Sequence, residues 1–165
     1  MIGDRLAEIE ARVAAACVRA GRKRNEVRLL AVSKGHSVAA VLEAYEAGLR
    51  DFGESYVQDW QKKAEDPALL RLHDLRWHFI GHLQRNKIRM LLGRVETVQT
   101  VDRIKLAREL SQRAEAQGRV QRVMLQVNLE EESSKSGFSG SEAAAALEQC
   151  LALPGLSPIG LLAIP

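Results

Sequence analysis

Short apolar segments alternate with amphipathic segments along the whole chain, and this alternation restricts the fold more than any other feature of the sequence. Segments typical of buried β-strands occur at residues 27–33, 50–53, 76–81, 95–101, 122–129 and 157–164. Helical patterns occur at residues 4–20, 38–47, from Ser55 onward, 84–92, 102–116 and 143–151. Strands that alternate with helices form right-handed β-α-β units, so the sequence predicts an α/β fold with a parallel sheet.

Two architectures have this alternation, the doubly wound open sheet and the (β/α)₈ barrel. A dinucleotide-binding doubly wound sheet has a glycine-rich loop after its first strand, where this chain has "SKGHS" with one glycine. We therefore expect a TIM-barrel-like fold. A complete barrel has eight strands and ~250 residues, so the predicted strands represent about six of eight β/α units in a single domain over residues 1–165. Six strands would leave two exposed strand edges.

Several polar residues stand where helices are expected to begin. Ser37 is a predicted N-cap for the helix over 38–47, which Gly48 closes. The other predicted caps are Ser55 with Gln58 as a capping box, Asp102, and Ser139 with Glu142 as a second capping box.

The composition is that of an ordinary globular protein, with 46% hydrophobic and 27% charged residues. The net charge of +3 comes from interspersed acids and bases, which does not favour nucleic-acid binding. No apolar run approaches the ~20 residues of a membrane span, and "MIGDRLAEIE" has acids where a signal peptide would be hydrophobic. We expect a cytoplasmic protein without membrane contact. Cys17 and Cys150 are far apart in sequence and are expected to be reduced, buried thiols.

Lys34 lies where the first apolar strand ends, in "LLAVSKGHS". The carboxyl ends of the strands form the face on which barrel sites are built. Apolar neighbours that keep the amine out of water would favour its neutral form, which is the form that attacks an aldehyde. The alternative is a strand-end lysine that extends its charged group into solvent.

Six segments occur in an order that resembles one protein family: "LLAVSKGHS", "AGLRDFGESYVQ", "WHFIGHLQRNK", "VQTVDRIKLA", "LQVNLEEESSKSG" and "GLLAIP". They resemble the pyridoxal phosphate homeostasis proteins, relatives of the alanine racemase N-terminal barrel. The resemblance runs from about residue 4 to the last residue. It implies a non-catalytic protein that binds pyridoxal 5′-phosphate (PLP) as a Schiff base on Lys34. The implied role is intracellular PLP homeostasis, by buffering the cofactor or delivering it to PLP-dependent client enzymes, and we expect a monomer or weak dimer.

The chain departs from the family pattern at two places near the expected site. The family commonly has a second lysine in V-S-K-T-K-P, where this chain has Gly35 and His36. The family usually has G-E-N-Y-V-Q, where this chain has Ser55 in place of the asparagine. Ser55 should cap the helix equally well, but its shorter side chain cannot reproduce a contact from an asparagine amide to the cofactor.

The ending is the largest departure, and we expect a C-terminally truncated barrel. The family continues past G-L-M-x-I-P with an S-M-G-M-S segment and a G-S-x-x-V-R-I-G segment. By resemblance, these supply the phosphate cradle and the arginine that faces the pyridine nitrogen. Phosphate sites in barrels usually follow the seventh and eighth strands, beyond the part of the fold that this sequence predicts.

Other residues are candidates for cofactor contacts. His78 or His82, with Asn86, is expected to shape the mouth of the barrel, and the alternative for a strand histidine is a bond to nearby backbone. A metal site is not expected, because no cysteine or carboxylate completes a ligand set. Lys135, in the loop "EESSKSG", either meets an anion or belongs to a turn before Ser139. Arg85, Lys87, Arg89 and Arg94 are expected on a solvated helix face.

Two other functions stay open at the level of sequence. An amino-acid racemase of this fold needs a second base opposite the lysine, often a tyrosine from an added domain. This chain has only Tyr45 and Tyr56, both in predicted helices, which disfavours an enzyme. The other alternative is a truncated product in which PLP binding is impaired.

Overall fold

The computed structural model describes residues 1–129 and 136–164. Its helices are α1 (Ile2–Arg19), α2 (Val38–Glu46), α3 (Val57–Ala64), α4 (Pro67–Leu70), α5 (Ile88–Leu91), α6 (Ile104–Glu115) and α7 (Ala143–Leu151), with 3₁₀ turns η1 (Arg24–Glu26) and η2 (Arg85–Lys87). Its strands are β1 (Ala31–Val32), β2 (Asp51–Glu54), β3 (Arg76–Phe79), β4 (Thr97–Val101), β5 (Gln121–Asn128), β6 (Phe138–Ser139) and β7 (Leu156–Ala163).

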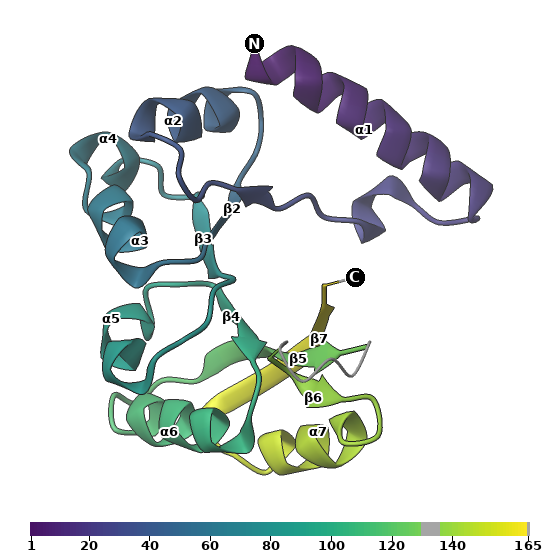
Figure 1. Cartoon of the computed structure of the whole chain (residues 1–165). Coiled ribbons are helices and arrows are strands. Elements are labelled where there is room, and N and C mark those ends of the chain that lie inside the picture. The colour runs from purple at the N-terminus through teal and green to yellow at the C-terminus, as the bar shows by residue number, and fades with distance from the viewer. Residues whose placement is uncertain (130–135, 165) are drawn as a thin grey trace.

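The strands form one parallel sheet. Strands β1 to β5 pair in chain order, and β7 pairs with β5 on its far side. The two-residue strand β6, which the sequence did not predict, also pairs with β5. Figure 1 shows the sheet as a curved arc with α2 to α7 along its outer side and α1 set apart from them. The six predicted strands and their parallel arrangement are confirmed, and no described strand joins β1 to β7.

The hydrophobic core lies between the sheet and the outer helices. Its largest fully buried apolar side chains come from both layers, and they are Trp60, Phe52, Phe79, Leu83, Ile88, Leu91, Leu106, Leu110 and Leu125. Strand β2 is buried at all four positions, whereas β5 alternates between buried and more accessible residues. Because side chains alternate between the two faces of a strand, β5 buries the face toward the helices and leaves the inner face accessible.

Some of the predicted helix ends are confirmed. The Ser37 hydroxyl accepts a hydrogen bond from the backbone N–H of Ala40 at 3.3 Å, and Gly48 follows α2 with a φ of 109°. Ser139 and Glu142 form the reciprocal bonds of the predicted capping box, at 2.9 and 3.3 Å, but these bonds close the turn before α7. They do not cap the helix, because α7 begins after Glu142, which makes no side-chain cap bond.

Two other predicted caps are wrong. Helix α3 begins after Tyr56, so Ser55 does not cap it; Ser55 instead packs its backbone against the third strand's end. Helix α6 begins after Arg103, and the Asp102 carboxylate is turned toward the side chains of His82 and Arg103 instead. For Asp102, a contact with His82, which is distant in sequence, takes the place of the local cap.

The first strand differs most from its prediction. A buried strand over 27–33 was expected, but β1 has two residues and Val32 is 48% exposed. Because β1 pairs with β2 alone among the described strands, its other edge has no neighbour to cover it. The helix expected over 84–92 is also shorter, since η2 precedes a four-residue α5.

Candidate functional site

The carboxyl ends of the first strands meet at one edge of the sheet. The backbone N–H of Ser33 donates to the carbonyl of Gly53, and that of Ile80 donates to the carbonyl of Glu54, both at 2.9 Å. These bonds continue the strand pairing beyond β1, β2 and β3. They bring the residues that follow, including Lys34, to the same edge, which in barrels is the functional edge.

Lys34 follows β1 directly and lies in a turn at this edge. The expectation that apolar neighbours keep its amine out of water is wrong, because Lys34 is exposed. The physical reason is the open edge of β1, with which no described strand pairs except β2 on the other side. The amine is therefore accessible to a reagent from solvent.

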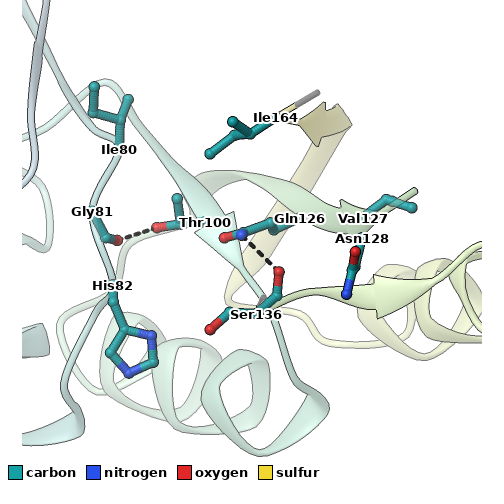
Figure 2. A pocket seen from close by; sticks show the side chains of 9 residues that line it. All are labelled: Ile80, Gly81, His82, Thr100, Gln126, Val127, Asn128, Ser136 and Ile164. Carbon is teal, nitrogen blue, oxygen red and sulfur yellow. Dashed lines mark hydrogen bonds between the residues drawn. The ribbon is translucent and has the colours of Figure 1, made fainter. Parts of the chain in front are cut away.

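A cavity of about 320 Å³ opens at the ends of β3, β4, β5 and β7. Figure 2 shows the residues that line it: Ile80, Gly81, His82, Thr100, Gln126, Val127, Asn128, Ser136 and Ile164. The Thr100 hydroxyl donates to the Gly81 carbonyl at 2.5 Å, and the Gln126 amide donates to the Ser136 carbonyl at 2.8 Å. The cavity thus combines apolar walls with polar groups from several strands, as small-molecule sites do.

Gly137 allows the chain to approach the end of β5 at the rim of this cavity. Its φ of 131° is a conformation that other residues rarely adopt. A Cβ at this position would lie 2.9 Å from the backbone nitrogen of Asn128 and 3.0 Å from the carbonyl oxygen of Gln126. Only glycine fits this close approach, which places Ser136 over the cavity.

His82 is shared with a neighbouring cavity of about 340 Å³, whose lining includes Ser55, Tyr56, Gln58, Gln84 and Lys87. His82 Nδ1 lies 3.2 Å from Asp102 Oδ2, and the histidine side chain is 58% exposed while the aspartate is buried. A buried carboxylate therefore orients an exposed imidazole at the rim. His82 and Ser55 thus line the same cavity, a proximity that could not be predicted from the sequence.

The remaining predicted site residues lie elsewhere. His78 is buried in β3, with Nε2 2.9 Å from Asp51 Oδ1 and Nδ1 3.1 Å from the Gln99 amide nitrogen, so it points toward the start of β2 rather than the mouth. Asn86 is exposed in η2 and does not line either cavity. Lys135 lies outside the described residues.

A buried ionic contact lies behind Lys34 and was missed by the sequence analysis. Lys63 Nζ is 2.5 Å from Glu54 Oε1, and both side chains are buried together with Ser33. One feature of the sequence could have indicated this contact: Glu54 ends an apolar strand and Lys63 lies on the helix that follows. A charge expected to be buried needs a partner of opposite charge, and Lys63 is near in sequence.

Two further findings concern residues 1–129 and 136–164. In this part of the chain no helix has the length and apolar character needed to cross a bilayer. Nor does it contain three grouped His, Cys, Asp or Glu side chains that could hold a metal ion.

Comparisons with known proteins point to one family. Residues 5–165 match the family model "Alanine racemase, N-terminal domain". The chain is 44% identical over 164 residues to the pyridoxal phosphate homeostasis protein of Pseudomonas aeruginosa, covering 99% of this chain and 70% of that one. Nearly the whole of this chain is thus similar to part of that longer protein.

Two solved structures are also similar. The crystal structure of an unknown protein from Bifidobacterium adolescentis has a TM-score of 0.92 and 36% identity, over 99% of this chain and 69% of that one. PipY of Synechococcus elongatus, solved with PLP bound, has a TM-score of 0.84 and 34% identity, over 100% of this chain and 71% of that one. With the family match, these confirm the predicted barrel-type fold.

Proposed function

The chain belongs to the pyridoxal phosphate homeostasis protein family, and on that premise we propose that it binds PLP non-catalytically, as a Schiff base on Lys34, for intracellular PLP homeostasis. The observation that carries the proposal is its similarity to PipY with PLP bound, over the full length of this chain. Delivery of the bound cofactor to PLP-dependent client enzymes is part of the same proposal.

The residues present fit such a group in three respects. Lys34 offers an accessible amine at the functional edge. The cavity of about 320 Å³ opens at the same edge of the sheet and is large enough for a small ligand, and Lys34 lies outside its lining. Ile80 and Ile164 supply apolar surface for a flat ring, while Thr100 and Gln126 supply polar groups.

The chemistry requires only that amine and an aldehyde. Lys34 would hold the group through a C=N bond between its nitrogen and the aldehyde carbon, with the aldehyde oxygen released as one water molecule. The neutral form of the amine is the nucleophile. The protein's part is to present the amine and to supply the surface against which the ring rests.

A racemase is the alternative function, and it would need a tyrosine as a second base near the site. The two tyrosines of the chain differ in how well their positions suit that role. The Tyr45 hydroxyl is hydrogen-bonded to Asp74, on the outer helical side of the fold. Tyr56 is 63% exposed and lines the cavity next to the site. Racemisation of alanine or serine above the free-PLP background, lost in Tyr56→Phe, would support the enzyme instead.

The decisive experiment is to mix the protein with PLP, reduce it with borohydride and locate the label by mass spectrometry. The expected result is a yellow protein that bleaches on reduction and carries the label at residue 34. Lys34→Ala should abolish the colour and leave the circular dichroism spectrum unchanged, whereas Lys62→Ala, which removes an exposed lysine of α3, should leave the colour intact. A colourless wild-type protein, or a label on another lysine, overturns the proposal.

A further inference from the structure

Three buried polar side chains meet directly behind the turn that carries Lys34. Glu54 is 0% exposed, Ser33 5% and Lys63 7%. Glu54 Oε1 accepts from Lys63 Nζ at 2.5 Å and from the Ser33 hydroxyl at 2.7 Å. The three residues come from the end of β2, the residue after β1, and α3, so the cluster ties a helix to two strand ends.

Ser33 is the residue immediately before Lys34, and the cluster holds its backbone as well as its hydroxyl. Its carbonyl oxygen accepts from Lys63 Nζ at 2.7 Å and from the backbone N–H of His36 at 3.1 Å. Its own N–H donates to the Gly53 carbonyl at 2.9 Å. The peptide that joins Ser33 to Lys34 is therefore held by both a turn and a buried cation.

Stability by itself does not explain the buried pair of Glu54 and Lys63. Burying an ion pair removes two charges from water, and apolar residues of similar volume often stabilise a fold equally well. The second oxygen of Glu54, Oε2, has no hydrogen-bond partner within the described residues, which adds to the cost. What the pair does achieve is to fix one peptide at an edge where β1 has only two paired residues.

We propose that Glu54 and Lys63 are positioning residues for the Lys34 amine, because they fix the Ser33–Lys34 peptide from which that side chain departs. The proposal rests on the proposed function of Lys34. A reactive group that starts from a fixed backbone loses less freedom when it meets its partner, and a displacement of about 1 Å can cost up to ~100-fold in rate.

The test uses a double variant, Glu54→Gln with Lys63→Met, which removes both charges and nearly conserves volume. Its folding is checked by circular dichroism and by its unfolding midpoint. Lys62→Met is the matched control, since it makes the same substitution at the neighbouring, exposed position of α3. Each protein is treated with PLP and cyanoborohydride, and the rate of labelling at residue 34 is measured by mass spectrometry.

We expect the folded double variant to label Lys34 at least ~10-fold more slowly than wild type, and Lys62→Met to label it at the wild-type rate. Equal rates in the folded double variant and wild type would overturn the proposal. Should the double variant fail to fold, Ser33→Ala keeps the ion pair and removes only the hydroxyl donor. It should slow labelling in the same direction, and an unchanged rate in that variant would also overturn the proposal.

A second measurement separates this proposal from the function of Lys34. Hydrogen exchange of the His36 amide, which donates to the Ser33 carbonyl, reports how firmly that peptide is held without any cofactor. It should be faster in the double variant than in Lys62→Met. Equal exchange in the double variant and in Lys62→Met overturns the positioning role. If exchange is faster in the double variant but wild type takes no label at Lys34, the proposed function is overturned, while the restraint of the Ser33–Lys34 peptide by Glu54 and Lys63 is supported.

Discussion

His78 Nε2 lies 2.9 Å from Asp51 Oδ1, so a histidine within β3 is hydrogen-bonded to the first residue of β2. Gln99 faces the other ring nitrogen, with its amide nitrogen 3.1 Å from Nδ1. An amide N–H donor makes Nδ1 the acceptor, so Nε2 carries the hydrogen and donates it to Asp51. These partners suit a neutral imidazole in the interior of the fold.

The stability of the protein should therefore depend on pH. Burial lowers the pKa of His78 below 6.5, although the hydrogen bond to Asp51 raises it. Burial would raise the pKa of Asp51, but hydrogen bonds from Arg76 and His78 outweigh it and lower the pKa from 3.8 to about 2. Both groups have a lower pKa in the folded state, so the unfolded chain binds protons first as the pH falls, and stability is lost.

The expected free energy of unfolding, measured in urea, is thus highest above pH 6.5, declines as the pH falls below that value, and declines again between pH 3.8 and about 2. His78→Gln keeps a polar side chain and should remove the first decline. A first decline of the same size in wild type and His78→Gln would contradict this account.

Gly81→Ala should severely destabilise the fold. An added Cβ would lie 1.9 Å from the carbonyl oxygen of Ser55, a backbone atom that no side-chain rotation can move away. Overpacking usually costs about 1–3 kcal/mol, and this contact should reach at least the upper end of that range in urea unfolding. Gly140→Ala is the control, because no atom lies within 4 Å of its added Cβ. Similar stabilities for the two variants would refute the prediction.

Lys63→Met alone should be more harmful than the double variant with Glu54→Gln. The single change leaves the fully buried Glu54 without its cation, and breaking a buried pair costs about 3–5 kcal/mol. The double variant removes the uncompensated charge and should recover most of that loss. Chemical denaturation of wild type and both variants measures the difference, and a double variant no more stable than Lys63→Met would show that the charge is not the cause.

Thr100→Val should weaken both the fold and the cavity wall. The two side chains have similar shape, but valine cannot donate to the Gly81 carbonyl, a bond of 2.5 Å in this structure. A buried acceptor left without its donor costs about 1–3 kcal/mol. Urea unfolding checks this cost, and a PLP titration checks the site, where we expect weaker binding. Unchanged stability would mean that another group satisfies the Gly81 carbonyl.

Much of the fold could be predicted from sequence because it depends on local patterns. The alternation of strand and helix periods located all six predicted strands, and Ser37 with Gly48 marked the ends of α2. The position of Lys34 at the end of the first strand also follows from the chain itself, as does its place at the carboxyl edge of a parallel sheet. Strand β6 was not predicted, since two residues are too few to show a period.

The environment of each polar group was decided only by the tertiary structure. Lys34 was expected to be dry and is exposed, because no described strand covers the free edge of β1. Lys63, on a helix where a solvated face would be ordinary, is buried against a carboxylate and against the backbone of Ser33, 30 residues away. Periodicity determines which face a side chain occupies, but burial, partners and pKa depend on segments distant in sequence, and these are set only when the sheet and helices pack together.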